Sequence, residues 1–161
     1  MKRFYVTERL LALGAKFDIY DEEMNNIFVA EADKFDIGKN ISIYNNICTK
    51  VLYMRQQIRF GSNKYIVYNQ EMREIAIIQK EFMMPKYNIS GNIGNLEMKS
   101  TSILGREYDI TNNGIVLGKI SKEFTLGRDR YCVEVLNEKY DIFFIALAIM
   151  IDMVNFHKNN S

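Results

Sequence analysis

Residues Ile142 to Ile151 read IFFIALAIMI, and this stretch decides the fold. Every side chain in it is apolar, so a helix built from it has no face that favours water. At about 1.5 Å per residue such a helix is roughly 15 Å long, half of a hydrocarbon layer about 30 Å thick, and Asp152 ends the apolar run. The stretch is therefore too short for a transmembrane segment, and it predicts a helix that the rest of the protein encloses. The large side chains expected in the core are Ile142, Phe143, Phe144, Ile145, Leu147, Ile149, Met150 and Ile151.

Three related segments recur about every 40 to 50 residues before this stretch. They begin as KFDIY at Lys16, KYIVY at Lys64 and REYDI at Arg106, and each runs through a polar turn into an apolar strand. Strand, turn and strand form a hairpin, and a further strand with alternating apolar residues follows each hairpin. With three more candidates, the pattern predicts about twelve short strands. These candidates are residues 3–6, 51–55 and 96–99.

A closed barrel accounts for both the strands and the apolar helix. About eight strands enclose only their own side chains, whereas a helix with side chains is about 10–12 Å wide and needs a wider lumen. About twelve strands supply that room, and closure removes the exposed sheet edges. We therefore predict a mainly β fold, a closed antiparallel barrel of about twelve strands around a buried C-terminal hydrophobic α-helix. Asp141 directly precedes the apolar run and is the predicted N-cap.

Length and composition predict a single domain over residues 1–161, with a disordered tail at 157–161. The 21 basic and 20 acidic residues nearly balance, which argues against nucleic acid as a partner. Cys48 and Cys132 belong to no Cys-x-x-Cys pair and are expected to be buried free thiols. Together with an N-terminal sequence that lacks a signal-peptide core, they favour the reducing cytoplasm.

No catalytic or metal-binding constellation stands out in the sequence. The only histidine, His157, is four residues from the C-terminus, away from any structure that would hold it against a nucleophile. One histidine and two dispersed cysteines do not match the ligand spacing of a zinc site. Residues 21–26 lack the alternating ligands of a calcium loop, and residues 91–95 lack the Lys-Ser/Thr of a phosphate loop. We therefore predict a non-enzymatic protein without a cofactor.

Positive charge is concentrated between residues 50 and 130, which contain 13 Lys/Arg and 8 Asp/Glu. Such a surplus usually forms a solvated surface and less often an anion-binding one. Arg128 and Arg130 share one side of an extended strand, and Asp129 between them would face the other way. The candidate residues for an anion or lipid site are Lys119, Lys122, Arg128 and Arg130.

Two further polar features have open roles. Asp152 interrupts the apolar helix where one side should still be enclosed, so it either bonds to strand backbone or water at the barrel mouth or marks the entrance of a pocket. A lysine with a phenylalanine just behind it follows each hairpin, and this recurrence favours a structural role at strand ends. The three signals are Lys34-Phe35, Lys80-Glu81-Phe82 and Lys122-Glu123-Phe124.

Five segments, taken in order and spacing, carry a family resemblance: RFYVTERLLALGAKFDIYD from Arg3, YNISGN from Tyr87, GIVLGKISKEF from Gly114, YCVEV from Tyr131 and DIFFIALAIMID from Asp141. The chain resembles bacterial-type members of the LURP-one-related proteins, which share the Tubby C-terminal-like fold. The resemblance implies a twelve-stranded barrel around a hydrophobic helix. The wider group includes phosphoinositide-binding domains, and phospholipid scramblases share the architecture. The lipid-binding lysine and arginine of the tubby domains have no match in this sequence.

Two functional hypotheses follow. The first is a cytoplasmic binding module, peripheral at the membrane, that engages anionic lipid headgroups or a membrane surface through basic loops at one end of the barrel. The second is a protein-interaction or scaffold domain with a protein partner and no small ligand. A contiguous apolar surface patch without a basic cluster beside it would favour the second.

Overall fold

Buried and exposed residues alternate along the strands, as expected for a sheet with one apolar face. In β2 (Ala15–Tyr20), for example, Ala15, Phe17 and Ile19 are buried and the residues between them are partly exposed. The computed structural model describes residues 1–9, 14–32, 40–59, 62–126 and 128–159, and these residues form twelve strands. The other strands are β1 (Lys2–Glu8), β3 (Asn26–Ala32), β4 (Ile41–Asn45), β5 (Lys50–Arg59), β6 (Ser62–Asn69), β7 (Glu74–Lys80), β8 (Lys86–Ser90), β9 (Leu96–Ser100), β10 (Glu107–Asn112), β11 (Ile115–Thr125) and β12 (Arg128–Val135).

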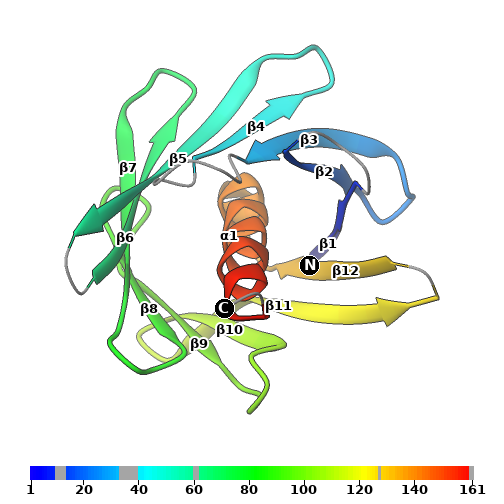
Figure 1. Cartoon of the computed structure of the whole chain (residues 1–161). Helices are drawn as coiled ribbons and strands as arrows, with labels where there is room; N and C mark the ends of the chain where they lie inside the picture. Colours follow the sequence, from blue (N-terminus) through cyan, green and yellow to red (C-terminus); the bar gives the residue numbers. More distant parts are fainter. Residues whose placement is uncertain (10–13, 33–39, 60–61, 127, 160–161) are drawn as a thin grey trace.

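The strands close into a barrel (Figure 1). Each strand pairs antiparallel with its neighbours in sequence, and β1 pairs with β12 to complete the circle. This closing pair sets Phe4 opposite Val133 and Val6 opposite Tyr131, so the apolar face is continuous across it. All twelve strands contribute buried residues to one hydrophobic core. The predicted closed antiparallel barrel is confirmed.

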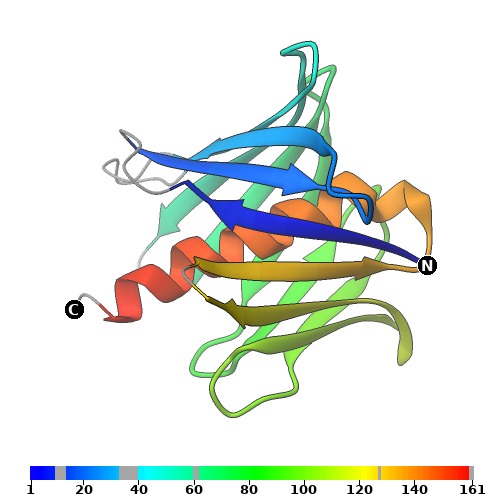
Figure 2. The same ribbon diagram turned by 90° about the vertical axis from the view of Figure 1, so that its right-hand side faces the viewer.

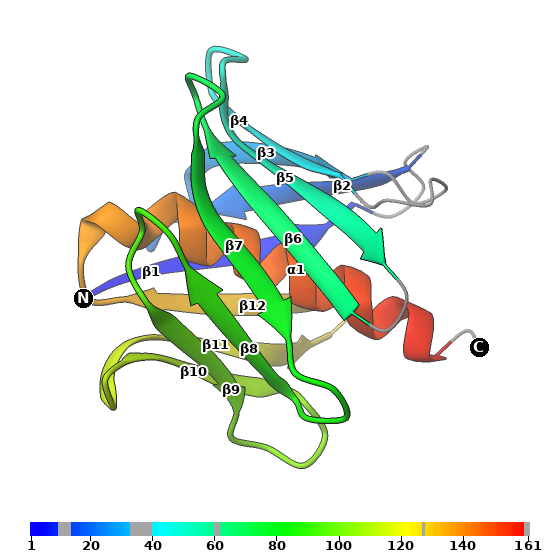
Figure 3. The same cartoon turned by 90° about the vertical axis from the view of Figure 1, so that its left-hand side faces the viewer.

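The helix α1 (Asp141–Asn159) runs through the barrel from the end where the N-terminus lies to the opposite end (Figures 2 and 3). Every side chain from residue 144 to residue 150 is completely buried, and Phe143 and Ile151 are nearly so. Ile142 is only partly buried, because it lies in the first turn at the rim. The helix continues through residues 157–159, where the sequence predicts a disordered tail, and residues 160–161 lie outside the described part of the chain.

A short 3-10 helix, η1 (Glu138–Tyr140), leads directly into α1 and corrects the predicted cap. The side-chain oxygen of Asn137 accepts a hydrogen bond from the backbone N–H of Lys139, 3.1 Å away, and caps this turn. Asp141 is therefore the first residue of α1 and not its N-cap. The ring of Tyr140 stacks on Phe144, with centroids 5.0 Å apart, and fixes the turn to the core.

The repeat seen in the sequence corresponds to a repeated turn. In three hairpins the side chain of the first turn residue accepts hydrogen bonds from the backbone N–H groups two and four positions later. The fourth residue of each turn has φ near +60°, which gives a left-handed conformation. Cys48 occupies such a position and is exposed, which corrects the expectation of a buried thiol, whereas Cys132 is buried. The first and fourth residues are Asp21 and Met24, Asn45 and Cys48, and Asn69 and Met72.

Gly118 of β11 is a close contact between the barrel wall and the helix. A β-carbon at this position would lie 2.5 Å from the carbonyl oxygen of Glu134 and 2.6 Å from the ring of Phe144. Glycine thus lets the aromatic ring of α1 pack directly on the strand backbone.

We expect the substitution Gly118→Ala to destabilise the protein by about 1–3 kcal/mol, because an added methyl group overpacks this contact. Urea unfolding followed by circular dichroism measures the change. Adding Phe144→Leu to the Gly118→Ala variant should recover part of the loss, since it removes the ring from the clash. A Gly118→Ala protein as stable as the wild type would contradict the position of Phe144.

Candidate functional site

The barrel end at which α1 finishes is the candidate site, because polar side chains gather at its mouth. The odd-numbered strands run toward this end (Figure 2). On these strands, the alternation of buried residues places one inward-facing residue near the mouth. On five strands that residue is polar, whereas the inward-facing residue two positions before it on the same strand is apolar and buried. These mouth residues are Glu8 on β1, Gln56 on β5, Lys80 on β7, Ser100 on β9 and Lys122 on β11.

Four buried tyrosines accompany the mouth residues, and each is the direct cross-strand partner of a mouth residue on the preceding strand. Burial raises the pKa of Tyr65 to about 12 and also raises the pKa of Tyr87. Their hydroxyl groups therefore stay protonated at neutral pH. The pairs are Tyr65 with Gln56, Tyr87 with Lys80, Tyr108 with Ser100, and Tyr131 with Lys122.

Asp152 of α1 lies among these residues and is partly buried. Burial raises the pKa of its carboxyl group to about 6, and the carboxylate of Glu8 adds to the increase. Lys122 and the hydroxyl group of Tyr131 lower this pKa and so act in the opposite direction. Asp152 therefore lies at the barrel mouth, and its neighbours are side chains from β1, β11 and β12.

Lys122 links the charged and aromatic parts of the mouth. Its Nζ atom lies 3.1 Å from the carboxylate of Asp129, 5.7 Å from the centre of the Tyr131 ring and 6.0 Å from the centre of the Phe124 ring. The guanidinium group of Arg106 lies 4.6 Å from the centre of the same Phe124 ring. Cations thus surround an aromatic side chain at the rim, an arrangement that cation–π attraction stabilises.

The predicted anion site is divided between two surfaces of the barrel. Lys122 is at the mouth, whereas Lys119 and Arg130 lie on outward-facing positions of β11 and β12. Lys119 pairs with Asp109 at 3.8 Å, and Arg130 pairs with Glu123 at 2.6 Å. The side chain of Arg128 lies outside the described part of the chain, as does Lys34 of the recurring lysines.

Sequence reasoning missed the exposed apolar side chains beside the mouth. They lie in the connections after β7 and β9 and at the end of β11, and the phenylalanines behind the recurring lysines were the available signal. Phe82 and Phe124 are both exposed, although the lysines before them are only partly so. The exposed residues are Phe82, Met83, Met84, Ile103, Leu104, Phe124 and Leu126.

Comparisons with known proteins identify the family. The family model described as LURP-one-related matches residues 2–152. The chain belongs to the LURP-one-related family. It is 22% identical over 156 residues to the uncharacterized protein YxjI of Bacillus subtilis strain 168, covering 96% of this chain and 94% of that one. An X-ray structure of a protein from Arabidopsis thaliana, AT5G01750, has the same fold, with a TM-score of 0.67 at 14% identity, over 95% of this chain and 91% of that one.

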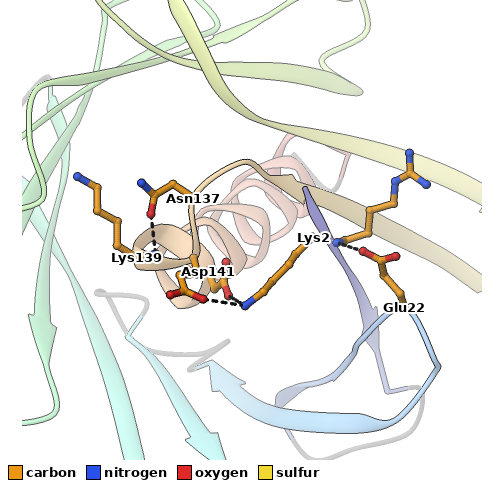
Figure 4. A network of polar contacts seen from close by, with 7 residues as sticks. Lys2, Glu22, Asn137, Lys139 and Asp141 are labelled. Atoms are coloured by element: carbon orange, nitrogen blue, oxygen red, sulfur yellow. Dashed lines mark hydrogen bonds and ion pairs between the residues drawn. The ribbon is translucent and has the colours of Figure 1, made fainter.

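At the opposite end of this LURP-one-related barrel, a surface hollow of about 520 Å³ lies beside the start of α1. Lys2 places its Nζ atom 3.1 Å from the carboxylate of Asp141 and 3.5 Å from that of Glu138 (Figure 4). The hydrogen bond with Asp141 is the main reason that the pKa of Lys2 is raised. The backbone N–H of Arg3 donates to Glu22 at 2.8 Å. These contacts tie β1 to the neighbouring turn and to the start of the helix, so the charged groups of the hollow have a structural role.

Within ranges 1–9, 14–32, 40–59, 62–126 and 128–159, no group of three or more His, Cys, Asp and Glu residues is placed to hold a metal ion. Among the same residues, no helix is long and apolar enough to cross a membrane.

The raised pKa of Asp152 predicts how stability depends on pH. The ordinary pKa of about 3.9 applies to the unfolded chain, so the folded state holds this proton more tightly. The resulting stabilisation is present below pH 4 and is lost as the pH rises through about 6. We expect Asp152→Asn, which resembles the neutral acid, to be more stable than the wild type by about 1–3 kcal/mol at pH 7.5 and to lose this advantage toward pH 4.

Urea unfolding at both pH values measures this difference. Asp129→Asn is the matched control, because it removes the ion pair between Lys122 and the exposed Asp129 and should change stability by less than about 1 kcal/mol. A less stable Asp152→Asn protein at pH 7.5 would mean that attraction to Lys122 outweighs the cost of burial.

Proposed function

We propose that this protein is a non-enzymatic, cytoplasmic binding module that engages an anionic membrane surface with the barrel end at which α1 finishes. The observation that carries the proposal is the unequal charge of three connections at each end of the barrel. At the proposed binding end, residues 80–86, 99–106 and 122–130 contain seven Lys/Arg and three Asp/Glu. At the other end, the hairpins at 20–27, 45–50 and 69–74 contain two Lys/Arg and five Asp/Glu.

Ion pairs within the protein reduce this charge but do not remove it. Lys86 is paired with Glu81 and Glu97, and Lys122 is paired with Asp129. Arg106 forms no ion pair with the described part of the chain, and its guanidinium group instead lies over Phe124. Such a cation is available to a phosphate oxygen of a lipid headgroup.

The resemblance to Tubby-like domains supports the same function, because that group includes phosphoinositide-binding members. It supports the class of ligand only, since fold analogy does not identify a binding site. The site proposed for this chain therefore rests on its own residues. Arg106 is the principal cation, Lys99 is an exposed second cation near the end of β9, and Lys122 is a contributor.

The alternative, a protein-interaction domain, predicts an apolar patch with no basic cluster beside it. Exposed apolar residues are present, but Arg106 and Lys122 both lie next to Phe124. A mixed apolar and basic rim fits an anionic membrane surface better than an apolar protein interface.

Co-sedimentation with vesicles tests the function. We expect binding to phosphatidylcholine vesicles that contain phosphatidylserine, no binding to pure phosphatidylcholine, and a clear loss of binding between about 25 and 300 mM salt. The double variant Lys99→Glu/Arg106→Glu should weaken binding at least tenfold, because each cation near the surface contributes about 1 kcal/mol.

Arg73→Glu, at the opposite barrel end, is the matched control and should bind as the wild type does. Failure of the wild type to bind anionic vesicles at low salt would rule out the proposal. An equal loss of binding in the Arg73→Glu variant would rule out the assigned end.

A further inference from the structure

The rim at the proposed binding end combines charge with large apolar side chains that are almost fully exposed. Phe82 and Met83 are 80% and 86% exposed, and Ile103 and Leu126 are as exposed as in an extended peptide, at 105% and 110%. None of these side chains belongs to the hydrophobic core. Their exposure is therefore a property of the loop tips and not of a poorly packed core.

The tips are ordered around one arc of the rim. The antiparallel ladder runs from β7 to β12 without interruption, so the connections after β7, β9 and β11 follow one another around the barrel. All three lie at the end where α1 finishes, as Figures 2 and 3 show from two opposite sides. Each carries at least one large apolar residue, namely Phe82, Ile103 and Leu126.

Cations lie just behind these tips. Arg106 follows Ile103 by three residues, and its guanidinium group covers Phe124 at 4.6 Å. Lys122, on β11, lies four residues before Leu126. Lys86, the first residue of β8, lies four residues after Phe82. Apolar side chains in front with cations behind them match the order of layers in an anionic bilayer, where acyl chains lie below phosphate groups.

We propose that the three loop tips insert Phe82, Ile103 and Leu126 into the interfacial layer of an anionic bilayer, so that the C-terminal end of α1 faces the membrane. This inference rests on the proposed function and adds the mode of contact to it. The charges select the anionic surface, and the inserted side chains hold the barrel in one orientation.

The chain contains no tryptophan, so single tryptophan reporters give an unmixed signal. Phe82→Trp and Leu126→Trp report from the proposed inserted tips, and Ile47→Trp, an exposed turn position at the opposite end, is the control. With phosphatidylserine-containing vesicles, we expect a blue shift of emission and quenching by brominated acyl chains for the first two variants. The Ile47→Trp emission should stay unchanged.

A second measurement separates insertion from simple charge attraction. Phe82→Ser/Ile103→Ser should reduce vesicle binding about tenfold at 150 mM salt while leaving the salt dependence as in the wild type, whereas Ile47→Ser should change neither. These exposed positions contribute little to the core, so the variants should fold.

The outcomes distinguish the two proposals. Wild-type co-sedimentation without any emission shift at Phe82→Trp or Leu126→Trp would overturn insertion and leave lipid binding in place. No co-sedimentation at low salt would overturn the proposed function itself. An emission shift at Ile47→Trp alone would reverse the orientation and so also overturn this inference.

Discussion

The whole structure depends on enclosing a helix that is apolar around its full circumference. Residues 144 to 150 of α1 are completely buried, and each of the twelve strands contributes side chains to that enclosure. An open sheet would leave one side of the helix in water, and a narrower barrel would have no room for it. Gly118 shows how closely the lumen is filled, because even a β-carbon there would collide with Phe144.

The middle of the helix is enclosed by the barrel, and its polar end lies at the barrel mouth. Asp152 follows directly after the last fully apolar turn, and a carboxyl group at that depth needs polar neighbours. Glu8, Lys122 and Tyr131 supply them from three different strands. The mouth is thus polar because Asp152 ends the apolar part of the helix at that depth. This barrel end therefore carries polar and charged side chains that the apolar interior lacks.

The sequence predicted the features that depend on composition and period. The uninterrupted apolar run required a buried helix, and the alternation of residues such as Phe17 and Ile19 indicated strands. It did not predict features that depend on register across strands. Lys122 meets Asp129 and Arg130 meets Glu123 only because β11 and β12 pair with a particular offset, and a run of residues along one strand contains no information on that offset.

The sequence patterns also did not predict the local geometry at the helix start and at the turns. Asp141 is a residue type that commonly forms an N-cap. Asn137, however, caps the preceding 3-10 turn, and this turn leads directly into α1, so Asp141 lies inside the helix. The helix dipole favours a carboxylate such as Asp141 in the first turn of α1, so part of the negative charge at that barrel end follows from the fold itself. The dipole gives no reason for Phe82 or Ile103 to lie in water, and it does not require Arg106 at the rim. The stability of the barrel does not require the exposure of Phe82 and Ile103 or the position of Arg106, and these features therefore indicate a binding surface.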